Sequence, residues 1–168
     1  MTHLDPELLG DFIRKGAAEV GATFTRPDAD WSPIAFIVAP SELVPVPLDE
    51  GMGNADDRDV VAMALAAQAL MVGATHVGLV LSTWQVLAQE REPDGPPPSE
   101  HPDRFEALLV DVISADEERL WIAKIERHDT LPPALSEWDG PSEAGESRFG
   151  RYIQPALRAV RDESASNN

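Results

Sequence analysis

The stretch that decides the fold is His76-Val77-Gly78-Leu79-Val80-Leu81-Ser82-Thr83-Trp84, an almost continuous apolar run without proline. A short run of this kind, bounded by turn signals, predicts a strand that is buried on both faces. Such a strand belongs inside a sheet that is covered on both sides. The run therefore predicts the central strand of an α/β domain.

Two helices are predicted before this strand. Asp5 can cap a helix that begins at Pro6 and ends at Gly21. A second helix is predicted from about Asp56 to Val72, with Gly73 as its stop signal. In the first helix the apolar residues at helical spacing are Leu8, Leu9, Phe12, Ile13, Ala17 and Val20. In the second helix the residues expected to pack closely against a sheet are Val60, Val61, Ala64, Leu65, Leu70 and Val72.

The remaining strands are predicted as two hairpins. Residues 34–38 and 43–46 form the first, and Pro45 and Pro47 place its second strand at a sheet edge. Residues 105–113 and 120–125 flank an acidic turn and form the second hairpin, next to the central strand. A last helix is predicted over residues 149–160.

Together these elements predict one α/β (α+β) domain over residues 1–161. It has a mostly antiparallel sheet of about five strands with two or three helices packed on it, in the order α-β-β-α-β-β-β-α. Residues 89–102 and 130–147 are rich in proline, glycine and acidic residues and are expected to be flexible loops. Residues 162–168 are expected to be a disordered tail.

Composition excludes several classes of function. The formal net charge is −17, from 13 basic and 30 acidic residues, so binding to nucleic acid is not expected. The charge permits a basic protein partner, although it also serves solubility alone. The absence of cysteine excludes disulfides and thiol chemistry. No apolar run is long enough for a membrane span and no signal peptide is evident, so a cytoplasmic location is expected.

The segment Ser99-Glu100-His101-Pro102-Asp103-Arg104-Phe105-Glu106 is the most distinctive candidate for chemistry. His101 could act as a general base, oriented by Asp103 or Glu106, and Arg104 adds a positive charge. The alternative is structural: Asp103 caps a turn, and Arg104 and Glu106 form ion pairs on the sheet. The strand that ends in Ser82-Thr83-Trp84, the loop after it and the segment Pro102-Asp103-Arg104-x-Glu106-x-Leu108 resemble a set of uncharacterised bacterial and phage proteins. That resemblance implies an α/β fold and assigns no activity.

Other sites have less support. His3, His76, His101 and His128 lack metal-ligand spacing, so no metal is expected, and no glycine-rich phosphate loop indicates a cofactor. Trp84 and Trp121 could stack on a ligand or could simply pack in the core. The favoured hypothesis is a non-enzymatic binding or accessory protein. The alternative is a small hydrolase, which requires His101, Asp103, Arg104 and Glu106 to converge in a pocket beside Trp84 or Trp121.

Overall fold

The structure is a computed structural model that describes residues 4–48, 52, 54–85, 90, 93–143 and 147–167. Its helices and strands follow one another along the chain as α1 (Pro6–Ala22), β1 (Ile34–Val38), β2 (Leu43–Pro47), α2 (Ala55–Val72), β3 (His76–Gln85), η2 (Pro98–Glu100), β4 (Phe105–Ser114), β5 (Glu118–Glu126), β6 (Ala134–Leu135), β7 (Asp139–Glu143) and α3 (Arg148–Ser166). The predicted α+β class and the order of its main elements are confirmed.

The strands form one antiparallel sheet in the order β2-β1-β3-β4-β5-β6, and β7 also pairs with β5. β3 lies between β1 and β4, as the apolar run predicted, and Val80 pairs with both Ile34 and Val110. The sheet has seven strands rather than about five, because β6 and β7 lie within the segment predicted as a loop. β6 is only two residues long, and β7 has the turn-like sequence Asp-Gly-Pro-Ser-Glu, so neither carries an alternating apolar pattern.

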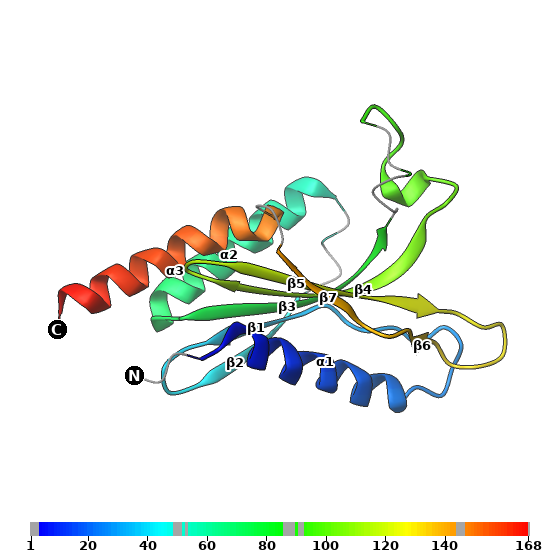
Figure 1. Cartoon of the computed structure of the whole chain (residues 1–168), viewed down its shortest axis with the longest axis horizontal. Coiled ribbons are helices and arrows are strands. Elements are labelled where there is room, and N and C mark those ends of the chain that lie inside the picture. The colour runs from blue at the N-terminus through cyan, green and yellow to red at the C-terminus, as the bar shows by residue number, and fades with distance from the viewer. Residues whose placement is uncertain are drawn as a thin grey trace.

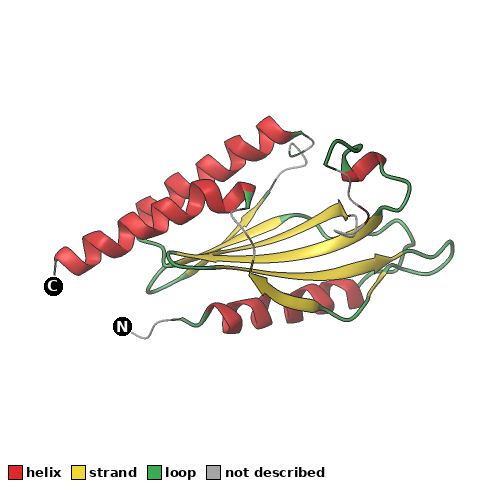
Figure 2. Cartoon of the chain, turned by 45° about the horizontal axis from the view of Figure 1, so that its top comes forward, coloured by secondary structure: helices red, strands yellow, loops and turns green. Residues whose placement is uncertain are grey.

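The sheet is covered on both faces (Figure 1). Helices α2 and α3 lie side by side on one face, and α1 lies alone on the other (Figure 2). The strand ends around β3 and β4 extend beyond the helices and carry the segment with η2 (Figure 1). The predicted 89–102 loop contains η2, and residues 89, 91 and 92 lie outside the described part. Within the described residues, no helix combines the length and apolar character needed to cross a membrane.

Each face of the sheet has its own core. Under α2 and α3, the buried sheet residues include Ile37, Leu79 and Ile113. Under α1, Val110 and Trp121 pack against Leu9 and Ile13 of the helix. Glycine lets α1 approach closely, because a Cβ at Gly10 would lie 2.4 Å from the Cη2 atom of Trp121.

Not every apolar position of α1 is in the core. Leu8, Phe12 and Val20 are exposed, although they share the predicted helical spacing with the buried residues. The apolar residues predicted for α1 cover a wider arc of the helix than its contact with the sheet, because a helix packs on a flat sheet along a narrow strip. Phe12 is held at the edge of this contact, in an edge-to-face arrangement with Phe36 at 6.5 Å between ring centroids.

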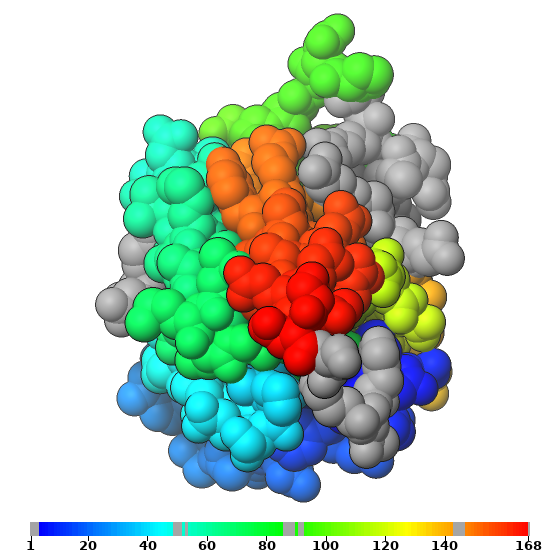
Figure 3. All heavy atoms as spheres, turned by 90° about the vertical axis from the view of Figure 1, so that its left-hand side faces the viewer, coloured from blue at the N-terminus to red at the C-terminus, as the bar shows by residue number. Residues whose placement is uncertain are grey.

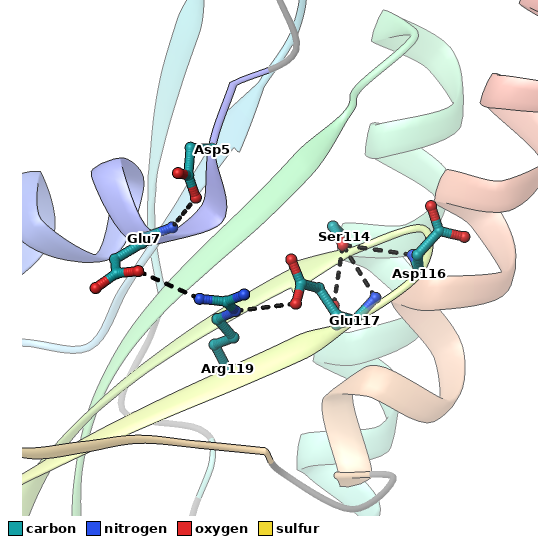
Figure 4. A network of polar contacts seen from close by, with 6 residues as sticks. All are labelled: Asp5, Glu7, Ser114, Asp116, Glu117 and Arg119. Atoms are coloured by element: carbon teal, nitrogen blue, oxygen red, sulfur yellow. Dashed lines mark hydrogen bonds and ion pairs between the residues drawn. The ribbon is translucent and has the colours of Figure 1, made fainter.

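A polar network ties the start of α1 to the turn between β4 and β5 (Figure 4). The Asp5 carboxylate caps α1 by accepting from the backbone N–H of Glu7 at 2.9 Å. Arg119 bridges Glu7 at 3.4 Å and Glu117 at 2.9 Å. The Ser114 hydroxyl accepts from the backbone N–H of Glu117 at 3.1 Å, which closes the turn. These contacts fix one end of α1 relative to the hairpin.

Helix α3 is longer than predicted. Ser147 caps its N-terminus by accepting from the backbone N–H of Gly150 at 2.9 Å, and the helix continues to Ser166 instead of ending near Val160. Residues 161–167 are exposed, so the last turns of α3 lack the buried apolar positions that predict a helix from sequence. They therefore gave no periodic signal in the sequence.

Candidate protein-binding surface

The side chains of the predicted catalytic segment are divided among different partners. His101 uses its Nδ1 atom to accept from the backbone N–H of Asp103 at 3.1 Å, and the Asp103 carboxylate lies 4.0 Å from the same atom. The Arg104 guanidinium stacks on the ring of Trp84, 4.9 Å from its centroid. His101 and Asp103 therefore come together in a local turn, while Arg104 packs on the neighbouring strand.

Glu106 takes part in a structural ion pair instead. Its carboxylate accepts from Arg127 in a bidentate arrangement at 2.7 and 2.6 Å. Arg127 also lies 3.3 Å from Asp30 and donates to the carbonyl of Ala29 at 2.7 Å. This bridge ties β4 and the end of β5 to the segment between α1 and β1. The convergence that the hydrolase hypothesis requires is not seen among these four side chains.

The two tryptophans proposed as ligand contacts have different surroundings. Trp121 is fully buried under α1, with the Arg14 guanidinium 5.0 Å from its ring centroid, so its ring has no open face for a ligand. Trp84 is 42% exposed near the end of β3, and Arg104 covers one side of it. Of these two tryptophans, only Trp84 presents aromatic surface to solvent. Among the described residues, no group of three His, Asp or Glu side chains is placed to hold a metal ion.

The most unusual surface belongs to α2. From Val60 to Val72 this helix contains no charged residue, and Gln68 is its only polar one. A helix on the surface of a domain normally carries polar residues on its outer side, and a helix that is apolar all round is normally buried. Here α2 packs on the sheet and on α3, and no other described helix or strand lies over its outer side (Figures 1 and 3).

The exposed side of α2 is a continuous apolar stripe. Its members recur every three or four residues, so they share one side of the helix. The residues of this α2 stripe are Val60, Met63, Ala64, Ala67, Leu70 and Met71, and all are exposed. Met71 is 86% and Val60 61% exposed. Single exposed apolar residues are common, but a contiguous apolar stripe on a helix marks an interaction surface.

The prediction for α2 was partly wrong. Val60, Ala64 and Leu70 were expected against the sheet, but they lie on the exposed side. The residues fully buried against the sheet are Ala62, Leu65 and Ala69, because two small alanines let the helix come close. An apolar pattern on all sides cannot show which side faces the core. The same pattern is the sequence signal that could have revealed the α2 stripe.

Acidic residues lie at one end of the α2 stripe. Asn54 caps α2 by accepting from the backbone N–H of Asp57 at 2.9 Å, and Asp56, Asp57 and Asp59 occupy the first turns. Asp59 lies 3.4 Å from Arg148 at the start of α3, whereas Asp56 is exposed. The stripe is therefore an apolar strip that begins at a cluster of negative charge.

Comparisons of the chain with protein-family models, with curated proteins and with solved structures found no match. The resemblance based on the Pro102-Asp103-Arg104-x-Glu106 pattern stays a prediction.

Proposed function

We propose that this chain is a non-enzymatic accessory protein that binds another protein through the α2 stripe. The partner contributes an apolar helix with lysine or arginine residues at its edges. The observation that carries the proposal is the exposure of six neighbouring apolar side chains along one side of α2. Burial of such a stripe against an apolar helix is a common mode of peptide recognition.

Charge supports a basic partner rather than a second copy of the chain. Each copy carries a formal charge of −17, so two copies repel one another when they approach. A helix with basic edges would instead be attracted to the whole surface and to Asp56 and Asp57 at the end of the stripe. The α2 stripe provides apolar contact area for the partner helix. The acidic residues orient the basic edges of that helix and increase its rate of association.

A photo-reactive amino acid at Met63 tests this proposal in cells that express the full chain. We expect cross-links to an apolar segment flanked by lysine or arginine. The purified partner should then bind the chain with an affinity that falls with added salt, because screening weakens the attraction between opposite charges. Met63→Glu should weaken this binding by about tenfold or more, as truncation of a central interface residue commonly does.

Leu131→Glu is the matched control. Leu131 is another exposed apolar residue, 59% exposed, in the loop between β5 and β6. This variant carries the same new charge and should bind the partner as the unmodified chain does. Cross-links from position 63 to a second copy, together with a dimer in sedimentation velocity, would overturn the proposal. Equal binding of the two variants would also overturn it.

A further inference from the structure

A second feature of the chain is a cavity on the α2 and α3 side of the sheet, away from the α2 stripe. Its volume is about 410 Å³, and its lining includes the first turns of both helices and the facing parts of β3, β4 and β5. This size lies within the range of small-molecule sites, roughly 300 to 1,000 Å³. None of the predicted catalytic residues lines it.

The lining combines apolar walls with two positive side chains. Leu81, Leu109, Leu120 and Phe149 form the apolar part. Arg58 of α2 and Arg148 of α3 also line the cavity. The Nε atom of Arg58 donates to the carbonyl of Met52 at 3.0 Å, and Arg148 donates to the carbonyl of Ala55 at 2.7 Å. Each guanidinium has five N–H donors, so both keep donors for a further acceptor.

The N-termini of α2 and α3 add to this positive character. α2 begins at Ala55 and α3 at Arg148, and Arg58 and Arg148 in the first turns of the two helices line the cavity. The N-terminus of a helix carries a partial positive charge and favours anions. Among the described residues, the charged side chains of the lining are Arg58, Arg148 and the buried Asp111, and Arg148 also lies 3.4 Å from Asp59.

The buried acid of this lining is Asp111. Asp111 is only 6% exposed, and its Oδ1 atom accepts no hydrogen bond from an N–H or O–H group within the described part of the chain. Its carboxyl lies within hydrogen-bonding range of the side chains of Glu118 and Ser147. Asp111 therefore belongs to a buried pair with Glu118 at the wall of the cavity.

Asp111 opposes an anion less than an exposed carboxylate does, because its surroundings favour the neutral form. Burial raises the pKa of Asp111 well above its usual range, and the neighbouring Glu118 raises it further. Glu118 accepts from the backbone N–H of Ser147 at 3.3 Å, so its charge is placed at the N-terminus of α3.

We propose that this cavity binds a small organic anion, a carboxylate attached to an apolar body. The ligand carboxylate accepts from Arg58 and Arg148. Its apolar body lies against Leu81, Leu109 and Phe149. This function is separate from protein binding at the α2 stripe, so Met63→Glu should leave it unchanged.

Hexanoate and benzoate are suitable probes, with hexanamide and benzamide as neutral analogues of the same shape. Titration followed by amide NMR shifts of the full chain should show binding of the carboxylates, with the largest changes at Leu109, Asp111 and Ser147. We expect the amides to bind at least about tenfold more weakly, because charge-assisted hydrogen bonds are the stronger ones. Inorganic phosphate, which lacks an apolar body, should bind more weakly than either carboxylate.

Arg58→Gln removes one positive group and should weaken hexanoate binding by about tenfold. Arg151→Gln is the control, since Arg151 is exposed on α3 and does not line the cavity. Equal affinity of carboxylates and amides, or shift changes confined to other parts of the chain, would overturn the proposal. The comparison of carboxylates with amides uses the unmodified chain, so it tests the proposed anion site even if Arg58→Gln fails to fold.

The pH dependence provides a further readout. Among the described residues, the charged or titratable groups that face Asp111 or line the same cavity are Glu118 of β5, Arg148 of α3 and Arg58 of α2. Loss of the Asp111 proton at higher pH places a negative charge against the ligand, so hexanoate affinity should fall as pH rises. Asp111→Asn should flatten this dependence, and an unchanged pH profile in that variant would contradict the role given to Asp111.

Discussion

Asp111 on β4 and Glu118 at the start of β5 form a buried pair of carboxyl groups that lie within hydrogen-bonding range of each other. Two buried carboxylates cannot both remain charged at short range without a large cost, so burial and the neighbouring Glu118 raise the pKa of Asp111. Gly150 makes room for the arrangement, because a Cβ there would lie 2.3 Å from the Oε2 atom of Glu118.

This pair predicts a specific dependence of stability on pH. The pKa of Asp111 is raised in the folded chain, so between about pH 4 and that raised pKa the folded state binds more protons than the unfolded state. The contribution of Asp111 to the free energy of unfolding is therefore fully present at low pH and is lost as pH rises. Its slope is at most about 1.4 kcal/mol per pH unit.

Asp111→Asn should remove this contribution, because the amide is neutral at every pH. Urea denaturation at several pH values should show the variant losing less stability than the parent as pH rises. Asp129→Asn changes an exposed carboxylate and is the control. If the two variants have the same pH profile, Asp111 does not hold the proton assigned to it.

Gly10 and Gly16 of α1 make a matched pair for steric packing. A Cβ at Gly10 meets the buried ring of Trp121 at 2.4 Å, whereas a Cβ at Gly16 meets nothing within 4 Å. Gly10→Ala should lower the free energy of unfolding by about 1 to 3 kcal/mol. Gly16→Ala should raise it by about 0.5 to 1 kcal/mol, since alanine is the better helix former. Chemical denaturation of both variants checks these signs, and equal effects would show that α1 does not pack closely on Trp121.

The Glu106–Arg127 bridge should contribute to stability rather than to chemistry. Arg127→Gln removes the bidentate pair and the contact with Asp30, and we expect a loss of about 1 kcal/mol, given the partial exposure of both side chains. The loss should shrink at high salt, because screening already weakens the pair in the parent chain. A loss that does not change with salt would show that the charges are not responsible.

The fold could be predicted because its signals are local. The run from His76 to Trp84 has the apolar continuity of a covered strand, and Asp5 and Gly73 mark a helix start and a helix end. β6 and β7 escaped prediction because β6 is only two residues long and β7 lacks the apolar residues of a typical strand. The last turns of α3 escaped it because they bury no apolar side chain.

The functional surfaces were harder to predict. His101, Asp103, Arg104 and Glu106 are adjacent in sequence, but their partners lie on other elements, so proximity in sequence did not make a site. Asp111 gave no signal, because one acidic residue in an apolar strand does not show which face it occupies or what lies there. Arg58 and Arg148 are 90 residues apart in the sequence, and they line the same cavity because α2 packs on α3.

The α2 stripe should be dispensable for folding, because its side chains are already exposed in the folded chain. Met71 is 86% exposed, so Met71→Gln should change the free energy of unfolding by no more than about 0.5 kcal/mol. Leu65→Ala on the opposite side of the same helix removes a buried side chain, and it should cost about 2 to 5 kcal/mol. Urea denaturation of both variants measures the difference. A large loss in Met71→Gln would mean that the stripe is covered in the folded chain, and would remove the basis for placing a partner on it.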